Sequence, residues 1–169
     1  MSVAVQLEPA LSSPPAVDYR WDADTDILTA RLRGVSAGAG MSGSVEIEGS
    51  DGSWLILDVA SGSIDGVEVA VWPDVHKRRG LAPPLAEDAR VVVPSRDDGA
   101  AVAALEVNTR LLAESDHTER VIHFRVGGPC DVRTVRLGND LLLDVDVRKS
   151  SIAGLWLLNV PPSPASFTL

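Results

Sequence analysis

The stretch Trp54–Pro73 reads WLILDVASGSIDGVEVAVWP and decides the fold class. Apolar and polar residues alternate on both sides of a turn rich in Gly, Ser and Asp, which is the pattern of two antiparallel strands. A second stretch, Leu141–Pro161, reads LLLDVDVRKSSIAGLWLLNVP and follows the same plan. Asp58 corresponds to Asp144, and in both stretches a glycine precedes the final proline by seven residues.

The similarity extends upstream of these two stretches. Asp26–Gly34 (DILTARLRG) aligns with Arg120–Gly128 (RVIHFRVGG), and Ser44–Gly49 (SVEIEG) aligns with Thr134–Asn139 (TVRLGN). Four elements therefore recur in the same order, which indicates an internal repeat of one unit of four or five strands.

The remaining apolar residues also come in short runs of Val and Leu, bounded by Gly, Asp, Ser and Pro, which favours strands over helices. The predicted strands are Val3–Leu7, Asp26–Arg33, Gly43–Glu48, Trp54–Val59, Val67–Trp72, Arg90–Val93, Val102–Leu112, Arg120–Val126, Val132–Leu137, Leu141–Val147 and Leu155–Val160. The linker Pro73–Pro84 carries Pro at both ends. We expect a mainly β fold with little helix, in which duplicated antiparallel sheet units form a sandwich or barrel with pseudo-twofold symmetry.

Length supports one compact domain of 169 residues, with residues 1–84 as the first repeat and its linker and residues 85–169 as the second. Apolar residues make up 45% of the chain. The formal net charge of −9 argues against nucleic acid and anionic membrane surfaces as partners. A single Cys excludes a disulfide framework.

The sequence shows few features that indicate targeting, processing or the organism of origin. No secretory signal and no apolar run long enough to span a membrane is visible, so we expect a cytoplasmic protein. Thirteen Arg against two Lys are typical of a GC-rich bacterial genome.

The first copy resembles the domain of unknown function family 2283, small bacterial β-rich proteins. The match rests on Tyr19–Leu28 (YRWDADTDIL) and on the Asp and Gly-x-Glu-x segments within 56–69, and covers about residues 19–75. A degenerate second copy covers about 117–162, where Trp156 stands in place of the family's Glu. The resemblance implies an α+β or all-β unit and no catalytic residue.

The last predicted strand is apolar on both faces, because Trp156 and Leu158 alternate with Leu155 and Leu157. Such a strand is either central in a sandwich or barrel, or buried by another chain. We therefore expect a homo-oligomer such as a homodimer. Trp72 and Trp156 are predicted to share the face opposite the core, where with Leu158 they would line a ligand pocket or an interface.

A contact surface is expected in the second half of the chain. That half is the less acidic one, with 9 basic and 12 acidic side chains against 6 and 12 in the first half.

Polar side chains at matching positions are the candidate catalytic groups. His123, Arg125 and Asp144 could supply a base, an anion clamp and an orienting carboxylate, and Asp58 with Arg31 occupies the corresponding place in the first copy. Cross-strand ion pairs explain these residues more simply, and we favour that interpretation.

Asp22, Asp24 and Asp26 have the spacing of a calcium loop, but Ile27 follows where an EF-hand needs Gly, so we favour an Asx-rich turn. No metal or other cofactor is indicated. The Gly-rich segment Gly34–Gly43 would be the natural lid if a ligand cavity exists.

Two functions fit these observations. The first is a non-catalytic interaction or small-ligand-binding protein, acting as a homo-oligomer on a protein partner or an apolar small molecule. The alternative is a cofactor-independent enzyme of the cyclase or isomerase type, which requires an apolar β-barrel cavity of several hundred Å³ facing His123.

Overall fold

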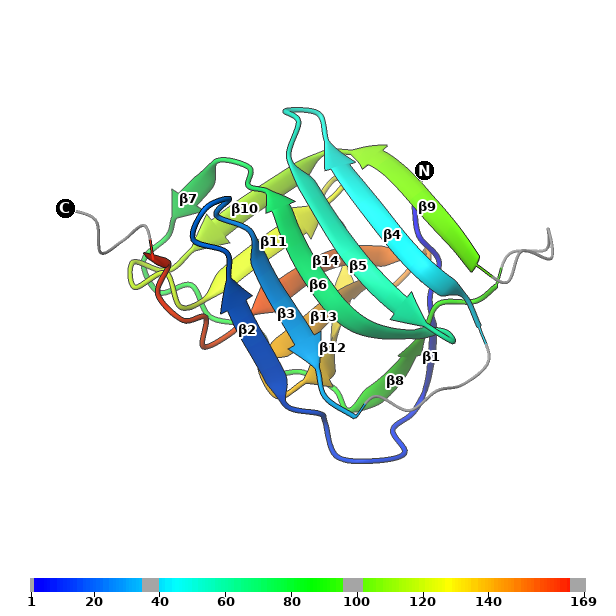
Figure 1. Cartoon of the computed structure of the whole chain (residues 1–169). Coiled ribbons are helices and arrows are strands. Elements are labelled where there is room, and N and C mark those ends of the chain that lie inside the picture. The colour runs from blue at the N-terminus through cyan, green and yellow to red at the C-terminus, as the bar shows by residue number, and fades with distance from the viewer. Residues whose placement is uncertain (1, 35–39, 96–101, 165–169) are drawn as a thin grey trace.

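The computed structural model describes residues 2–34, 40–95 and 102–164, and within them the chain is nearly all β (Figure 1). Two six-stranded sheets carry most of the strands. Sheet 1 has the order β2 (Val17–Trp21), β3 (Leu28–Leu32), β6 (Ser63–Val71), β5 (Trp54–Ala60), β4 (Ser42–Gly49), β9 (Val102–Thr109). Sheet 2 has the order β7 (Val75–Lys77), β10 (Leu111–Ser115), β11 (Ile122–Val126), β14 (Ile152–Leu157), β13 (Leu141–Asp146), β12 (Val132–Gly138). β1 (Gln6–Pro9) and β8 (Ala89–Val92) form a third, two-stranded sheet.

The core lies between the two large sheets. Side chains on alternate positions of both sheets are at most 1% exposed and belong to one cluster, including Leu28, Leu55, Leu57, Val67, Phe124, Leu143 and Leu155. This alternation is the one expected from the sequence, because successive side chains of a strand point to opposite faces. The predicted mainly β fold is confirmed, and of the two alternatives left open the structure is sandwich-like.

Five strands of each large sheet follow the same order. In sheet 1 the order is β2-β3-β6-β5-β4, and in sheet 2 it is β10-β11-β14-β13-β12. Each sheet gains a sixth strand from the other half of the chain: β9 pairs with β4 and β7 pairs with β10. Both of these pairings are parallel, so each large sheet consists of the five antiparallel strands of the expected unit and one added parallel strand at an edge.

Three predictions about individual strands differ from the structure. The predicted strand Val102–Leu112 is divided at Arg110, since β9 belongs to sheet 1 and β10 to sheet 2. The predicted linker Pro73–Pro84 contains β7. The sequence analysis missed β2, although Val17, Tyr19 and Trp21 alternate with polar residues there.

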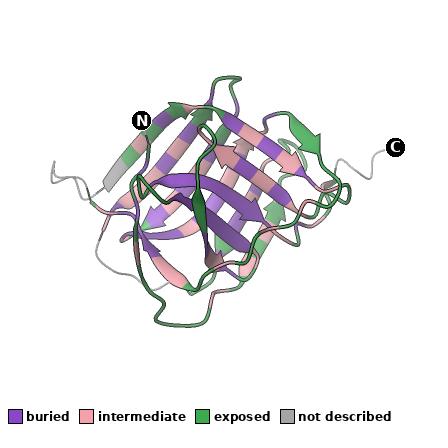
Figure 2. Ribbon diagram, turned by 180° about the vertical axis from the view of Figure 1, so that it is seen from behind, coloured by how far each residue is buried: buried purple, intermediate pink, exposed green. Residues whose placement is uncertain are grey.

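The last strand, β14, is central in sheet 2 and buried on both faces within a single chain. Every residue of β13 and β14 is buried, and in the view from behind two neighbouring strands are buried along their whole length (Figure 2). The segment 78–88 begins after β7, at one edge of sheet 2, and reaches β12 at the other edge. There the N–H of Glu87 donates to the carbonyl oxygen of Thr134. No second chain is needed to cover Trp156, which is 6% exposed.

Trp72 lies on the core side, which corrects its expected position beside Trp156. The register between β5 and β6 shifts by one residue next to the Trp54–Val71 pair, and such a bulge moves the following side chains to the other face. Val71 is consequently 46% exposed, whereas Trp72 stacks on Trp21 and contacts the ring of Phe124.

Among the described residues, the structure contains no helix with the length and hydropathy of a membrane span. Part of the Gly-rich segment expected as a lid, residues 35–39, lies outside the described residues.

Candidate functional site

The candidate catalytic residues of the first copy form a cross-strand row on the outer face of sheet 1. Asp58 on β5 lies opposite Gly66 on β6, and Gly66 lies opposite Arg31 on β3. Because Gly66 has no side chain, Arg31 reaches across β6, and its Nη1 lies 3.1 Å from Oδ2 of Asp58. The expected ion pair is therefore present, and both side chains are partly or largely exposed. A surface ion pair of this kind gives the two residues a structural role.

The second copy has the same row with different partners. Asp144 lies opposite Gly154, which lies opposite Arg125. The Asp144 carboxylate instead accepts a hydrogen bond from Oγ1 of Thr134 at 2.8 Å and contacts Nε2 of His123 at 2.9 Å. The side chain of Arg125 has no hydrogen bond or ion pair with the described residues, so the structure joins two members of the expected trio and leaves out the third.

His123 and Asp144 form a buried polar cluster. Their side chains are 14% and 5% exposed, and the His123 ring stacks on Trp156 with 3.9 Å between ring centroids. The Nε1–H of Trp156 is buried without a partner among the described residues. These contacts fix the orientation of the imidazole. Neither His123 nor Asp144 lines either of the two pockets described below.

The DADTD segment forms the turn between β2 and β3. The N–H of Asp24 donates to Oδ1 of Asp22 at 2.9 Å, and the N–H of Asp26 donates to the carbonyl oxygen of Asp22. These are the contacts of an Asx turn. The described residues contain no group of three or more His, Cys, Asp or Glu side chains placed to hold a metal ion.

A cleft of about 1020 Å³ opens at one end of the sandwich and is lined by both large sheets. Its floor is apolar: Ile47 and Val107 come from sheet 1, Val126 and Ile152 from sheet 2. We call it the end cleft, and its full lining is Ser2, Val3, Ile47, Val107, Thr109, residues 126–131, Asp146, Arg148, Lys149 and residues 151–153. Apolar walls with a few polar groups are typical of small-molecule sites.

The rim of the end cleft is built on the turn between β13 and β14. The N–H groups of Lys149 and Arg148 donate to Oδ1 of Asp146 at 3.1 and 2.8 Å and hold the pKa of this carboxyl below its usual value. The carboxylate is therefore occupied by the backbone of the turn. The side chains of Arg148 and Lys149 have no hydrogen bond or ion pair with other described residues, which leaves two cations available at the rim.

Cys130, an exposed residue on the same rim, has a thiol whose pKa is raised. Burial raises the pKa of its thiol, and the neighbouring Asp146 carboxylate raises it further. A thiol with a raised pKa is mostly protonated at neutral pH and reacts slowly.

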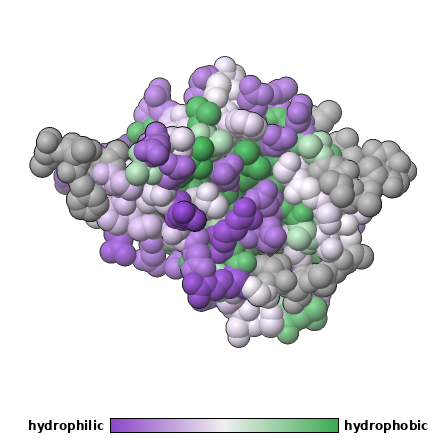
Figure 3. All heavy atoms as spheres, viewed as in Figure 1, coloured by the Kyte–Doolittle hydropathy of each residue, from purple (hydrophilic) through white to green (hydrophobic). Residues whose placement is uncertain are grey.

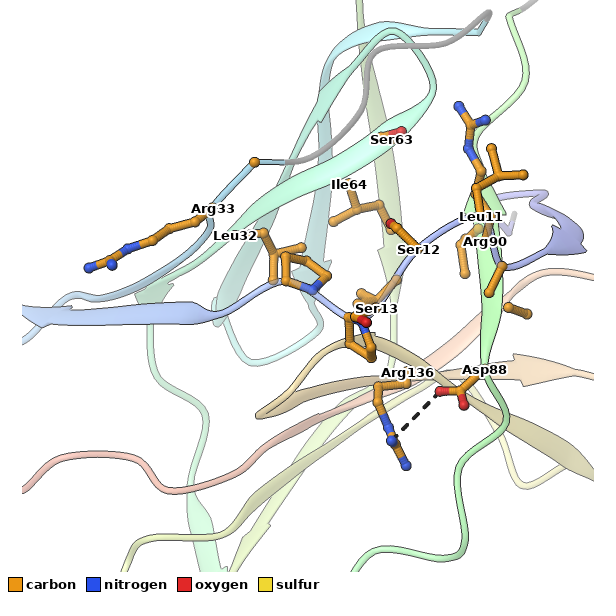
Figure 4. A pocket seen from close by; sticks show the side chains of 17 residues that line it. Leu11, Ser12, Ser13, Leu32, Arg33, Ser63, Ile64, Asp88, Arg90 and Arg136 are labelled. Atoms are coloured by element: carbon orange, nitrogen blue, oxygen red, sulfur yellow. Dashed lines mark ion pairs between the residues drawn. The ribbon is translucent and has the colours of Figure 1, made fainter.

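A smaller pocket of about 300 Å³ lies beneath residues 10–15, beside Leu32, Ile64 and β8 (Figure 4). Its arginines are already ion-paired within the chain: Arg136 with Asp88 at 3.6 Å, Arg90 with Glu8 at 4.0 Å, and Arg33 with Asp18. Arg33 points away from the other lining side chains in Figure 4. The end cleft is thus the larger pocket and the one with unpaired charge.

No known family model matches the chain, and a search of curated proteins found no similar sequence. The resemblance to the domain of unknown function family 2283 therefore stays a prediction.

No pattern in the sequence predicts the end cleft. Its lining comes from five separated parts of the chain, and none of them carries a motif. Of the residues expected to form a ligand pocket or interface, Trp72, Trp156 and Leu158, none lines the end cleft or the smaller pocket.

Proposed function

We propose that this protein is a non-catalytic binding protein whose end cleft holds a small amphipathic molecule with an anionic group. The apolar part of the ligand would lie against Val126, which is half-buried, and against the small surface that Val107 and Ile152 expose. Its anionic group would contact Arg148 and Lys149. The observation that carries the proposal is the combination of an apolar, inter-sheet floor with two cationic side chains that make no hydrogen bond or ion pair with the described residues, although the charge of Lys149 also acts on the Asp146 carboxylate.

Size and chemistry both support this ligand class. A volume of about 1020 Å³ is sufficient for a drug-sized or lipid-like molecule. Burial of apolar surface would provide most of the affinity, since each buried CH₂ contributes about 0.8 kcal/mol. Charge-assisted hydrogen bonds from Arg148 and Lys149 would fix the orientation and select the anionic group.

Two dyes of similar size test the proposal directly. Anilinonaphthalene sulfonate is an apolar anion, and N-phenylnaphthylamine is its uncharged relative. We expect both dyes to bind and to gain fluorescence. The variant Gly128→Trp places an indole in the cleft, where an added Cβ has no neighbour within 4 Å, and should abolish binding of both dyes. The matched control Leu85→Trp, at a residue that is 96% exposed and outside the cleft, should bind both normally.

The double variant Arg148→Gln/Lys149→Gln tests the role of charge. It should weaken the sulfonate dye by about tenfold and leave the neutral dye unchanged, because about 1.5 kcal/mol of charge-assisted bonding is lost. Arg79→Gln/Arg120→Gln removes the same charge at two exposed positions outside the cleft and is its control. Dye binding that persists in Gly128→Trp, or an equal loss in both double variants, would contradict the proposal.

We also propose that the two sheets arose by duplication of one five-stranded unit. Three features support it: the shared strand order, the matching rows through Gly66 and Gly154, and a register shift directly after Asp58 and directly after Asp144. The homo-oligomer expected from the sequence stays a prediction, because the strand that suggested it is buried within one chain.

A further inference from the structure

We infer that the outer face of sheet 1 is a docking surface for a basic amphipathic segment of another protein. This surface, which we call the acidic face, consists of Glu46, Glu48, Glu68 and Glu106 around Trp54, Ile56 and Val71. It belongs to a different part of the molecule from the end cleft, so this inference and the proposed function can fail separately.

Strand register places two carboxylates of the acidic face, Glu46 and Glu106, side by side, and puts Glu68 two strands away from Glu46. Glu46 lies opposite Glu106 on β9 and opposite Ile56 on β5, and Ile56 lies opposite Glu68 on β6. Directly opposite residues of neighbouring strands are about 5 Å apart. Like charges at the spacing of Glu46 and Glu106 destabilise a sheet, and none of the four glutamate side chains has an ion pair or hydrogen bond with the described residues. Cations from outside the chain would relieve this repulsion.

Exposed apolar side chains lie next to these carboxylates. Trp54 is directly opposite Val71, and the two are 37% and 46% exposed. Glu48 on β4 lies directly opposite Trp54 on β5, so Trp54 and Val71 lie next to the carboxylates of the acidic face. Figure 3 looks onto this side of the molecule and shows hydrophobic residues among hydrophilic ones. Trp is enriched among the residues that dominate binding energy at protein interfaces.

Charge complementarity decides the kind of partner. A second copy of this chain would bring two acidic faces together, and nucleic acid or an anionic membrane would be repelled as well. A segment with Lys or Arg flanking apolar residues fits both features of the face. Its apolar residues would cover Trp54 and Val71, and its cations would reach the glutamates.

A labelled synthetic peptide of alternating Lys and Leu residues is the probe, and the same peptide with Glu in place of Lys is the reference. Titration at low salt should show binding of the Lys peptide only. Glu46→Gln/Glu106→Gln should weaken that binding by about tenfold, and Trp54→Ser should weaken it by a similar factor. The control Asp24→Asn/Glu119→Gln removes the same charge from exposed positions outside both the acidic face and the end cleft and should weaken binding less than twofold.

The control also separates a local surface from net charge. Equal weakening by both double variants would mean that the peptide senses only the overall charge of −9 and would overturn the inference. Absence of binding to the unmodified protein, or unchanged binding by Glu46→Gln/Glu106→Gln, would overturn it as well. Both double variants should fold, because neither removes a contact within the core.

Discussion

Nε2 of His123 lies 2.9 Å from Oδ2 of Asp144, in a cluster that also holds Thr134 and the ring of Trp156. At the equivalent row of sheet 1, Asp58 pairs with Arg31 near the solvent. The same backbone arrangement therefore supports a buried polar cluster in one sheet and an exposed ion pair in the other. This contrast provides matched controls within one molecule.

Removing the two aspartates should have unequal effects. Asp144→Ala leaves the buried hydroxyl of Thr134 and the ring nitrogen of His123 without their acceptor, and we expect a loss of about 2 kcal/mol in unfolding free energy. Asp58→Ala breaks an exposed pair and should cost less than about 1 kcal/mol. Urea denaturation of both variants measures the difference. Equal losses would show that the cluster around His123 contributes nothing beyond an exposed ion pair.

The two glycines of the rows should differ in the same way. An added Cβ at Gly154 would lie 2.5 Å from the carbonyl oxygen of Phe124, a backbone atom that cannot move without shifting β11. Gly154→Ala should therefore cost about 2 kcal/mol or more. At Gly66 the nearest atom is Nη1 of the flexible Arg31 side chain, at 2.8 Å, so Gly66→Ala should change stability by less than about 1 kcal/mol. Thermal unfolding compares them, and a larger loss for Gly66→Ala would refute the packing argument.

Asp65 should make the protein less stable as the pH rises. Burial raises the pKa of this carboxyl above its usual value, and one of its oxygens is buried without a hydrogen bond within the described residues. Because the folded state binds the proton more tightly than the unfolded state, this residue favours folding at low pH. The contribution is lost as the pH rises through the raised pKa.

Asp65→Asn removes that dependence. We expect the melting temperature of the variant to exceed that of the unmodified protein by about 2 °C at neutral pH and the gap to close near pH 4. Asp24→Asn, at an exposed turn, is the control and should show no such gap. A gap that widens toward acid pH would contradict the sign of the raised pKa.

The tryptophans should divide into structural and peripheral residues. Trp72 stacks on Trp21 at 5.7 Å between ring centroids, contacts Phe124, and donates its Nε1–H to the carbonyl oxygen of Asp26 at 2.8 Å. Trp72→Ala should cost about 3 kcal/mol. Trp54→Ala, at a residue that is 37% exposed, should cost less than about 1 kcal/mol. Chemical denaturation with far-UV circular dichroism measures both, and a small loss for Trp72→Ala would mean that the stack is not part of the core.

The sequence by itself determined most of the strands and most of the side chains that point inward, because both depend on a period of two residues along a single strand, although β2, β7 and the orientation of Trp72 were not predicted. It also showed that Asp58 and Asp144 occupy corresponding positions of the two repeats. The tertiary structure decided everything that depends on the choice of neighbour. It placed β9 beside β4 and β7 beside β10, and it moved Trp72 to the core through a one-residue register shift.

The candidate sites depended on the same kind of long-range contact. Whether Asp144 pairs with Arg125 or His123 is set by a packing difference on the outer face of sheet 2 that alternation does not encode. The end cleft exists only where ends of both sheets and the turn at Arg148 meet. Periodicity is local to a strand, whereas a cleft and a hydrogen-bond partner are properties of segments that lie far apart in the chain and become neighbours on folding.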